Sequence, residues 1–434
     1  MERALDAMER MTDRFDRAAT LNFTTVVECD GVLPDEALRR ALRAVEARHP
    51  LLRSAITEGG AGDGPRFVPG AAAEIPVDVE DGDAERVQTL VQRSLVHRPW
   101  ALAGPRGYLR VVRMGSERSI LLLTLHHTVS DGSSGFLLVR DLLRASQGLP
   151  LGGHLPSPGP KHFLPPPTDQ TSAAVRRMLD ELAALGQPSR FQDQEAPAAQ
   201  RVPHVRVLRL TRSATDRMLS RCKGAGGTVQ GWLVAVLARA VAAELTRDRA
   251  HESVVLRVGH PVDLRRYLDR WHGGQAEIGE RVGYYVSAVD TAHRVGRQQD
   301  LPALAREVST ALQMALERGY PLLTGPVAGV TLHQRTVEMA DEAFRAFAEQ
   351  HAMLGAFGLS NLGRLEALGL SGEVGALRVR SGYFVTASSV FGALGAAAST
   401  FAGRLTLALQ CVAPLMGQDR FERVAAQVAE TLEA

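Results

Sequence analysis

The sequence predicts an α/β or α+β protein with two domains, and three observations support this. First, 434 residues exceed what one compact core usually holds and suit two domains of about 150 to 220 residues each. Second, segments with the two-residue period of strands alternate with segments of helical spacing along the chain. Third, a stretch rich in proline and glycine at 147–170 separates the two halves. Each domain should therefore pack helices on a sheet in two layers.

The first half of the chain predicts strands and helices in alternation. Residues 21–31 alternate between apolar and polar positions, as a strand does. Apolar residues at helical spacing then predict a helix that ends at His49, because a proline follows it. We interpret His49 as a helix-end residue rather than a ligand. Residues 107–125 predict a β-hairpin whose second strand is too apolar for a sheet edge. A helix should follow, capped by Ser133 and Ser134.

The second half repeats this alternation without a visible sequence repeat. Strands are predicted at 204–211, 253–263, 282–291, 355–363, 381–390 and 404–412. Helices are predicted at 173–186, 228–246, 302–319 and 336–350. The segment 381–403 carries no charge and is long enough to span a bilayer, but its Gly, Ala, Ser and Thr residues make transfer into lipid weak. We therefore expect buried β structure there, with a turn near 392–397, and no stable membrane span.

These signals divide the chain into three parts. The first domain covers residues 1–150 and contains the hairpin. A Pro-rich linker and crossover covers 151–202: clustered proline and glycine up to residue 170 cannot sustain helix or sheet, and the helix predicted at 173–186 extends the crossover. The second domain covers 203–434.

The composition excludes several classes of protein. With 50 basic and 48 acidic residues, the net charge is +2 and no basic arm can follow a phosphate backbone, so we expect no nucleic-acid partner. The three cysteines lie far apart without CxxC spacing, which fits a reducing compartment. The N-terminal stretch is charged and lacks the apolar core of a signal peptide. We therefore expect a cytoplasmic protein, and a monomer.

Arginine dominates the basic residues, since only Lys161 and Lys223 are lysines among the 50. A genome of high GC content explains this bias without any function. Alternatively, arginine patches could dock an acidic partner such as a carrier protein, because the planar guanidinium group suits phosphate and carboxylate.

The stretch LLLTLHHTVSDG, residues 121–132, places two histidines, an aspartate and a glycine directly behind an apolar strand. Adjacent strand residues point to opposite faces, so His126 and His127 could not both bind one ion, and we expect no metal site. A serine hydrolase is disfavoured because no GxSxG motif is present. Backbone amides at the start of the following helix favour a developing negative charge. A buried pair of histidines that only stabilises a turn remains the alternative to a catalytic role.

A lone general base is the functional interpretation that we favour for this stretch. A neutral imidazole can take a proton from a hydroxyl or amine while that group attacks a carbonyl. We assign this role to His127. Asp131 could point back into the turn and fix its shape, especially if a distant arginine pairs with it. Gly132 would let the backbone pass close to a substrate or adopt a left-handed turn.

HHTVSDG resembles the HHxxxDG signature of the chloramphenicol acetyltransferase-like superfamily, which includes nonribosomal peptide condensation domains, plant BAHD acyltransferases and polyketide-associated acyltransferases. RHPLLR at 48–53, PVDLR at 261–265 and LSNLG at 359–363 agree with this resemblance, which spans nearly the whole chain. Length, PVDLR and SNLG make the chain most similar to the phthiocerol/phthiodiolone dimycocerosyl transferase type. The DFGWG motif of the plant branch is missing, and SNLG stands roughly in its place.

The resemblance implies two domains of similar fold, each a mixed sheet packed with helices, which meet along a tunnel with His127 near its middle. It implies an ion pair that holds the motif loop, which we assign to Asp131 and Arg265. In this family the first histidine is the less important one, so His126 should pack or bond to the backbone.

The implied reaction is acyl transfer from a thioester to an alcohol or amine in a ternary complex, without an acyl-enzyme. His127 would take the acceptor's proton, and Ser360, Asn361 and the amide of Gly132 are candidates to stabilise the oxyanion. A strand-end turn with local bonds is the rival interpretation of Ser360 and Asn361. We expect no tightly bound cofactor. The donor would be the phosphopantetheine of an acyl carrier protein or acyl-coenzyme A.

We expect an O-acyltransferase that gives an ester in polyketide, lipid or other secondary-metabolite biosynthesis. A freestanding condensation enzyme would instead form an amide, and it shares every motif named above. An inactive carrier-protein-binding module and a hydrolase are the remaining alternatives.

Overall fold

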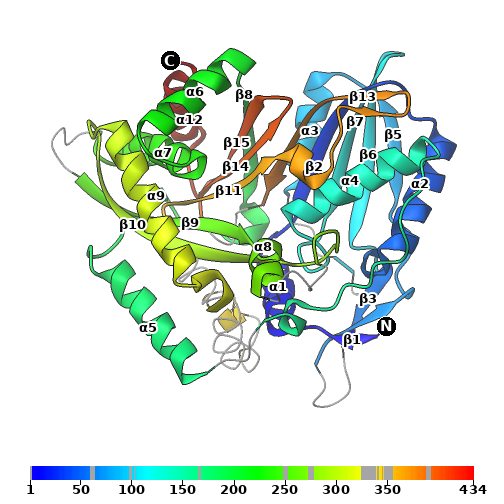
Figure 1. Ribbon diagram of the computed structural model, residues 1–434, viewed down its shortest axis with the longest axis horizontal. Helices are drawn as coiled ribbons and strands as arrows, with labels where there is room; N and C mark the ends of the chain where they lie inside the picture. The colour runs from blue at the N-terminus through cyan, green and yellow to red at the C-terminus, as the bar shows by residue number, and fades with distance from the viewer. Residues whose placement is uncertain are drawn as a thin grey trace.

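The computed structural model describes residues 2–434 except 59–63, 97–99, 102, 165–167, 248–252, 272–277, 324–338, 340–341, 345, 347–354 and 388–391. Two lobes stand side by side, each a sheet with helices packed on it (Figure 1). This is the mixed α/β class that the sequence predicts.

The first lobe is built on a six-stranded mixed sheet. Its order is β12 (Glu373–Val374), β13 (Leu377–Thr386), β2 (Phe23–Asp30), β7 (Arg118–Leu125), β6 (Gly107–Met114) and β5 (Val77–Asp81). All neighbouring strands are antiparallel except β5 and β6. The predicted hairpin over 107–125 is confirmed as β6 and β7. A small sheet of β1 (Arg3–Ala4), β4 (Arg66–Pro69) and β3 (Ser54–Thr57) lies below it (Figure 1).

Helices cover both faces of this first sheet. They are α2 (Asp35–Arg48), α3 (Ala84–Ser94) and α4 (Gly132–Ser146), whereas α1 (Ala7–Ala18) lies below the sheet beside α8 (Arg265–Trp271) (Figure 1). The hydroxyl of Thr24 on β2 bonds Ser94 of α3 at 2.7 Å, whereas the next residue, Thr25, lies against Gly135 of α4. Because adjacent strand residues face opposite sides, α3 and α4 cover opposite faces. The helix predicted to end at His49 does so, with Arg48 as its last residue.

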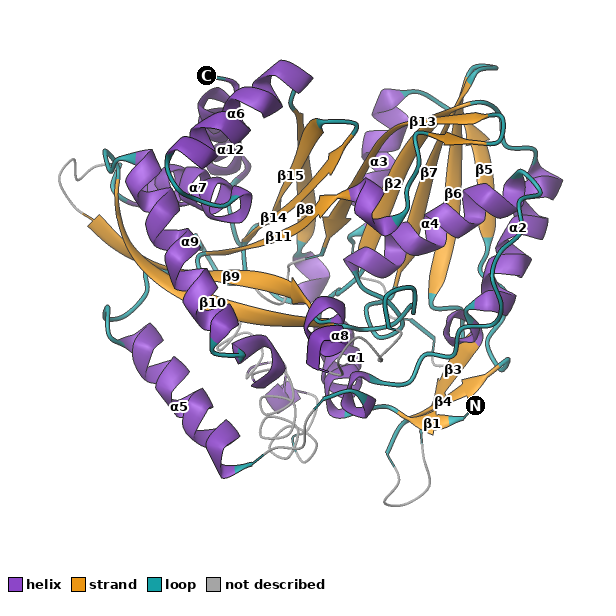
Figure 2. Ribbon diagram, in the orientation of Figure 1, coloured by secondary structure: helices purple, strands orange, loops and turns teal. Residues whose placement is uncertain are grey.

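The second lobe is built on another six-stranded mixed sheet. Its order is β10 (Val286–Gly296), β9 (Ser253–Asp263), β11 (Phe357–Arg364), β14 (Leu394–Phe401), β15 (Arg404–Ala413) and β8 (Val202–Arg209). Its helices are α5 (Asp169–Ala183), α6 (Arg212–Gly224), α7 (Val229–Leu245), α8 (Arg265–Trp271), α9 (Leu301–Glu317) and α12 (Gln418–Glu433) (Figure 2). Nearly every residue of α7 between Gly231 and Ala242 is buried, which explains why it is apolar on all sides.

Two strands from the C-terminal part of the sequence complete the first sheet. After β11 in the second sheet, the chain crosses to form β12 and β13, which pairs with β2, and it then returns as β14. The two sheets therefore meet along β13 and β14, where Ser399 Oγ donates to the Gly382 carbonyl at 3.0 Å. Ala397, Phe401 and Val205 of the second sheet belong to the same apolar cluster as the first sheet. The lobes thus share a core.

Two details of the sequence prediction are corrected. The turn expected near 392–397 is wrong, because β14 begins at Leu394 and its small residues let it approach β13 closely. The strand expected from residue 282 begins at Val286. The helix predicted at 336–350 falls mostly outside the described residues.

Within the described part of the chain no single helix meets the length and hydropathy criteria for crossing a membrane, and only α6 and α7, bent by 98° to each other, meet them as a pair.

Candidate active site

The motif HHTVSDG forms the corner between β7 and α4, directly at the junction of the lobes. The side chain of Asp131 accepts a hydrogen bond from the Ser134 amide at 2.8 Å and is the capping residue of α4. The sequence prediction that Ser133 and Ser134 cap this helix is therefore wrong. An acid at this position satisfies a first-turn amide and complements the positive end of the helix dipole.

His127 has a hydrogen-bonding pattern that fixes one tautomer of its ring. Its Nδ1 lies 2.9 Å from the carbonyl oxygen of Ser130. A carbonyl oxygen can only accept, so Nδ1 carries the proton and Nε2 keeps its lone pair. The side chain is half-buried, and Phe23 and Tyr284 contact its ring at centroid distances of 5.2 and 5.3 Å. Nε2 is thus the nitrogen that could accept a proton.

The electrostatic environment keeps this imidazole neutral. Burial lowers the pKa of His127 below its ordinary value, and the neighbouring ring of His126 acts in the same direction. The carboxylate of Asp131 raises the pKa but does not offset the burial. At neutral pH His127 is therefore uncharged and available as a base.

His126 has the opposite tautomer and is bonded on both ring nitrogens. Its Nδ1 accepts from the amide and the hydroxyl of Thr128, at 3.0 and 2.7 Å. Its Nε2 lies 3.1 Å from a carboxylate oxygen of Asp16 on α1, to which it donates. The side chain is buried, with 1% exposed. It connects α1 to the motif loop and leaves no ring nitrogen for a substrate.

Asp131 and Arg265 form a buried ion pair across the lobe junction. Nη1 of Arg265 lies 2.9 Å from Asp131 Oδ2, which also accepts from the amide of Tyr285 at 2.8 Å. Burial alone lowers the pKa of Arg265, but the carboxylates of Asp131 and Asp263 outweigh it and raise that pKa above its ordinary value. Arg265 therefore stays charged, and the pair ties the start of α4 to the second lobe.

Further bonds hold the start of α4 against the second lobe. Ser134 Oγ accepts from Arg265 Nη2 at 2.8 Å and donates to the Gly283 carbonyl at 3.1 Å. Ser133 Oγ donates to Asp263 Oδ2 at 2.7 Å. The two serines are thus contacts between lobes, so the motif corner is positioned by both.

Gly132 is the first residue of α4 and does not have a positive φ, so the suggested left-handed turn is wrong. A Cβ at this position would lie 3.3 Å from Leu362 of β11 and 3.6 Å from Phe384 of β13. A larger residue here would therefore require the Leu362 side chain to shift by a few tenths of an ångström.

Ser360 and Asn361 lie on β11, the strand that approaches Gly132 through Leu362. Ser360 pairs with Ala397 of β14, which belongs to the apolar cluster of the first sheet, so the Ser360 side chain is directed to the side of the first lobe. Asn361 Oδ1 instead accepts from the Gly363 amide at 2.9 Å, which is the local bond of a strand-end turn. The structure thus brings Ser360 and the start of α4 to the same junction and engages Asn361 locally.

A chain of buried polar side chains supports β11 and had no clear signal in the sequence. Gln230 Nε2 on α7 donates to the Leu359 carbonyl at 3.0 Å and lies 3.1 Å from His260 Nδ1. His260 then contacts Thr291, which contacts His293, each at 2.8 Å. Because an amide nitrogen can only donate, Nδ1 of His260 accepts and its Nε2 donates. Gln230 therefore holds the backbone beside Ser360 in a fixed orientation.

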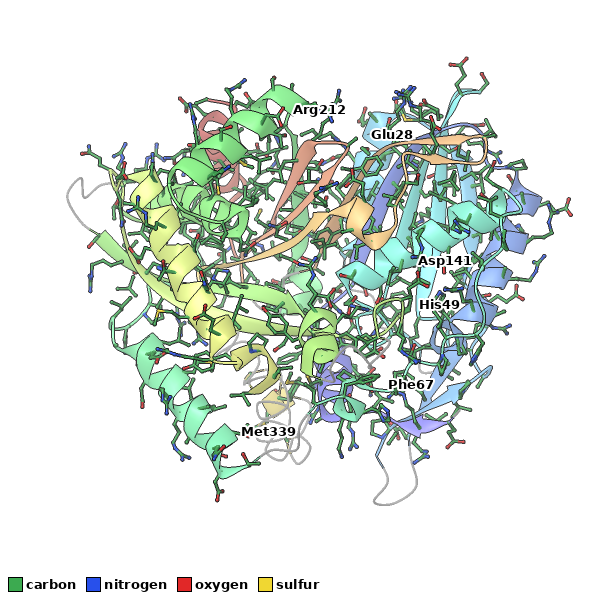
Figure 3. All side chains as sticks on the ribbon, viewed as in Figure 1. Glu28, His49, Phe67, Asp141, Arg212 and Met339 are labelled. Carbon is green, nitrogen blue, oxygen red and sulfur yellow. The ribbon has the colours of Figure 1, made fainter. Side chains whose placement is uncertain are left out.

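The RHPLLR segment forms a second buried polar cluster in the first lobe. His49 Nε2 lies 3.0 Å and Arg48 Nε 3.1 Å from the same oxygen of Asp141 on α4, and Figure 3 shows His49 and Asp141 side by side. Arg48 Nη2 also reaches Glu280 of the second lobe at 2.8 Å. His49 is thus more than a helix end, since it ties α2 to the helix that carries Asp131.

Two residues near the motif were missed by the sequence reasoning. Tyr284 lies edge-on to His127, and burial raises the pKa of Tyr284 to about 12, so its hydroxyl stays protonated at neutral pH. Asp16 fixes the tautomer of His126. Neither belongs to a recognisable motif.

Among the described residues, no group of three or more His, Cys, Asp or Glu side chains is arranged to hold a metal ion. The tunnel beside His127 stays a prediction.

Two family models match consecutive parts of the chain. The model for the C-terminus of phthiocerol/phthiodiolone dimycocerosyl transferase matches residues 199–410, and the condensation domain model matches residues 11–165. Over 217 residues the chain is 29% identical to the nonribosomal peptide synthetase fso1 of Omphalotus olearius, a match that covers 48% of this chain and 5% of that protein. The chain therefore spans only a small part of this curated relative.

Two solved structures have the same fold along nearly the whole chain. The trichothecene 15-O-acetyltransferase TRI3 from Fusarium sporotrichioides has a TM-score of 0.75 at 13% identity, and the match covers 100% of this chain and 95% of that one. Polyketide synthase associated protein 5 from Mycobacterium tuberculosis has a TM-score of 0.62 at 17% identity, with 97% and 96% covered. Together with the family models, these similarities place the protein in the chloramphenicol acetyltransferase-like superfamily of condensation domains and acyltransferases.

Proposed function

We propose that this protein is an acyltransferase that moves an acyl group from a thioester to a hydroxyl acceptor and so forms an ester. The observation that carries the proposal is the state of His127. Its Nδ1 proton is held by the Ser130 carbonyl, and Nε2 is left as a neutral base at the junction of the lobes. A base of this kind needs no acid partner, because its orientation is already fixed by the backbone.

In the proposed reaction, Nε2 of His127 takes the proton of the acceptor hydroxyl as its oxygen attacks the thioester carbonyl. The tetrahedral intermediate then collapses, the carbon–sulfur bond breaks, and the imidazolium returns the proton to the leaving thiolate. The lowered pKa of His127 favours this return, because the protonated ring gives up its proton readily. No covalent acyl-enzyme is formed.

The developing oxyanion would lie near the start of α4. The amides of Gly132 and Ser133 are in the first turn, where a helix has no internal acceptor for them. Ser360 on β11 is the side-chain candidate. Asn361 is the second side-chain candidate: the bond from the Gly363 amide to its Oδ1 orients the side chain, and its Nδ2 is the group that would donate to the oxyanion. Each effective donor would contribute about 3 to 4 kcal/mol to the barrier reduction.

The Asp131–Arg265 pair is proposed as a positioning element. It touches neither ring nitrogen of His127, but it caps α4 and ties it to the second lobe. The backbone oxygen that orients His127 belongs to Ser130, the residue directly before Asp131. Displacement of this cap would therefore move the carbonyl that selects the tautomer.

The donor proposed is an acyl thioester on the phosphopantetheine arm of a carrier protein or on coenzyme A. The acceptor proposed is a small-molecule alcohol of a polyketide, lipid or other secondary-metabolite pathway. Support comes from the match to the phthiocerol/phthiodiolone dimycocerosyl transferase C-terminus over 199–410.

Amide formation is the second candidate, because the condensation domain model matches residues 11–165, which include the motif corner. An amine acceptor would use the same base and the same oxyanion donors. An inactive carrier-binding module is disfavoured because the tautomer and the ion pair that catalysis needs are both in place.

The test supplies acyl-coenzyme A and acyl-carrier thioesters with a panel of alcohols and amines and identifies products by mass. Ester formation that disappears in the His127→Ala variant supports the proposal. Amide alone would replace it with the second candidate, and free acid alone would indicate a hydrolase. If the protein is folded but forms no product from any donor, the inactive carrier-binding module would be favoured.

A further inference from the structure

A concave site lies at the far end of the lobe junction from His127. It is a cleft of about 1130 Å³ whose walls come from both lobes. Arg118, the first residue of the eight-residue strand β7, lines this cleft. His127 lies two residues after the last residue of the same strand. At about 3.4 Å per residue the two ends are roughly 24 Å apart. Figure 3 shows Glu28 and Arg212 on the two sides of this end of the junction.

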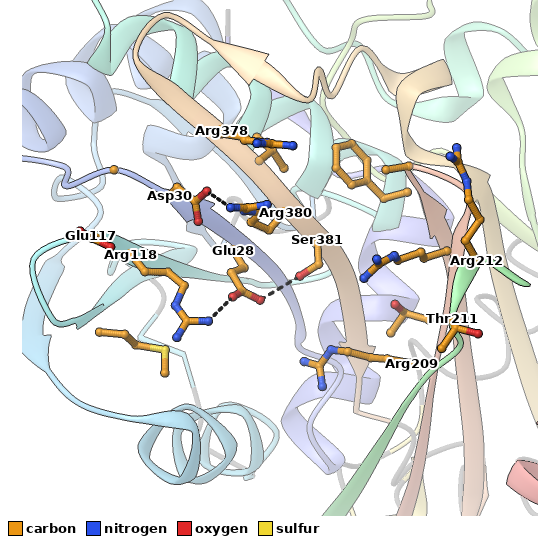
Figure 4. Close-up of a pocket in the computed structure, with 18 of the residues that line it drawn as sticks. Glu28, Asp30, Glu117, Arg118, Arg209, Thr211, Arg212, Arg378, Arg380 and Ser381 are labelled. Carbon is orange, nitrogen blue, oxygen red and sulfur yellow. Dashed lines mark hydrogen bonds and ion pairs between the residues drawn. The ribbon is translucent and has the colours of Figure 1, made fainter. Parts of the chain in front are cut away.

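The lining of the cleft is strongly basic. Its charged residues are Arg118, Arg209, Arg212, Arg378, Arg380, Arg404, Glu28, Asp30 and Glu117. Glu28 pairs with Arg118 at 3.0 Å and Asp30 with Arg380 at 2.5 Å, both on the first-lobe wall (Figure 4). The acidic groups of these two pairs are thus engaged with arginines of their own wall.

The second-lobe wall presents arginines to which the structure assigns no carboxylate partner among the described residues. These are Arg209 on β8, Arg212 at the start of α6 and Arg404 on β15. Arg209 lies over the ring of Tyr383 on β13, with 5.1 Å between the guanidinium carbon and the ring centroid. With six arginines against three carboxylates, Glu117 included, the lining carries a net charge of +3, so an anion in the cleft would relieve repulsion.

The position of Arg212 is set by its surroundings. A Cβ at Gly403 would lie 2.8 Å from Arg212 Nε, so the guanidinium group packs directly on the turn between β14 and β15. Arg212 also begins α6, a 13-residue helix whose cap, Thr211, lines the same cleft. The Thr211 hydroxyl already accepts from the Ala214 amide, and other first-turn amides of a helix have no internal acceptor and can bind anions.

We propose that this cleft binds a small molecule that carries two or more phosphate groups and bridges the two lobes. Arginine forks bind phosphate oxygens in pairs, and three elements of the second lobe aim such groups or helix amides at one space. The volume is close to the range of small-molecule sites. A folded carrier protein is disfavoured as the occupant because the site is a cleft between lobes rather than an open face.

The cleft is distinct from the proposed thioester site. The roughly 24 Å to His127 is filled by the shared apolar core and by contacts such as Ser399 with Gly382, so the two sites are not joined along this line. A ligand held by Arg378 of β13 and Arg212 of α6 would instead bind the lobes to each other. The proposal therefore does not depend on the acyl-transfer chemistry.

The experiment measures binding of tripolyphosphate and of ATP to the full chain by isothermal titration calorimetry at constant ionic strength. Coenzyme A is left out because it could also enter the thioester site. Saturable binding of either probe is expected, weakened at least tenfold in Arg212→Ala and in Arg404→Ala. The matched control is Arg43→Ala, an exposed arginine on α2 outside the cleft, which should bind as the wild type does.

Tripolyphosphate and ATP distinguish a site for phosphate alone from one that also holds a nucleoside. Equal affinity indicates the former, and tighter binding of ATP indicates the latter, and both support the proposal. Absence of saturable binding, or equal weakening by Arg43→Ala, overturns it. Circular dichroism of each variant checks the fold, and Arg404→Lys, which keeps the charge but loses the fork, should have intermediate affinity.

Discussion

The two lobes contain the same strand-to-helix corner, but only one of them carries the candidate chemistry. In the first sheet β2, β7, β6 and β5 are neighbours in this order, and in the second sheet β8, β15, β14 and β11 are neighbours with the same sequence of antiparallel, antiparallel and parallel pairs. The corner from β7 to α4 therefore corresponds to the corner from β15 to α12.

The equivalent corners differ in their polar groups. The first contains His127 and is capped by the buried carboxylate of Asp131. The second has Gly417 at the cap position with no side-chain cap, and the Gly417 amide donates to Asp193 at 2.7 Å. Asp193 pairs with Arg420 near the surface. The fold thus supplies two similar positions, and buried polar side chains at one of them make it a candidate site.

Of the changes proposed, removal of the His127 imidazole at the first corner should reduce activity most. His127→Ala is expected to reduce kcat/KM by about 10² to 10⁴ fold, because the variant loses the proposed acceptor of the substrate's proton. Unfolding in urea should change little, since the ring makes only one hydrogen bond in the described structure. Retention of wild-type turnover would remove His127 from the mechanism.

Neutralising one charged residue of the ion pair at each corner should change stability by very different amounts. Arg265→Met leaves Asp131 buried without its partner and should lower the free energy of unfolding by about 3 to 5 kcal/mol. Asp193→Asn at the second corner is the matched control. Its side chain is 35% exposed, so the loss there should be about 1 kcal/mol or less.

Denaturant unfolding of both variants measures this difference. Asp131→Asn combined with Arg265→Met should cost less than the sum of the single changes, because the double variant leaves no unpaired buried charge. Similar decreases in the free energy of unfolding at the two corners would mean that the Asp131–Arg265 pair stabilises the protein no more than an exposed ion pair does.

The two adjacent histidines should separate stability from catalysis. His126→Ala removes the bonds to Asp16 and Thr128 and is expected to lower the free energy of unfolding by about 1 to 3 kcal/mol. Its kcat should fall less than tenfold, because neither of its ring nitrogens faces a substrate. A loss of kcat as large as that of His127→Ala at unchanged stability would assign His126 a catalytic role.

The sequence predicted the local elements better than their assembly. Strands and helices with strong periodicity, such as 107–125 and 228–246, were located from residue pattern alone, because burial of one face imposes that pattern. The pairing of β13 with β2 depends on contacts such as Ser381 with Glu28, which are 353 positions apart in sequence, and no local pattern encodes it. The same reason explains why Asp16 and Tyr284 were missed near the motif.

The site was predicted in part through the resemblance and in part through chemistry. Asp131 and Arg265, paired from motif position, lie 2.9 Å apart. Ser133 and Ser134 were misjudged because both serine and aspartate are good caps, and only the structure shows that the serines bond to the second lobe instead. Of the two roles predicted for Gly132, the left-handed turn is wrong because its φ is not positive, and a close approach to a substrate stays a prediction.

The smallest expected effect concerns pH, and it tests whether the environment of His127 differs from that of an ordinary imidazole. Catalysis needs the neutral ring, so kcat/KM should fall as protonation increases at low pH. With the ordinary pKa of 6.5 the fall between pH 8 and pH 6 would be about fourfold, and the lowered pKa of His127 should make it smaller. The folded pKa also lies below the unfolded one, so the corresponding stability is present above about pH 6.5 and is lost as the pH falls toward the folded pKa. Rate profiles and urea unfolding at the same pH values give two independent measurements, and a midpoint above 6.5 in the rate profile would contradict the burial of a neutral base at this corner.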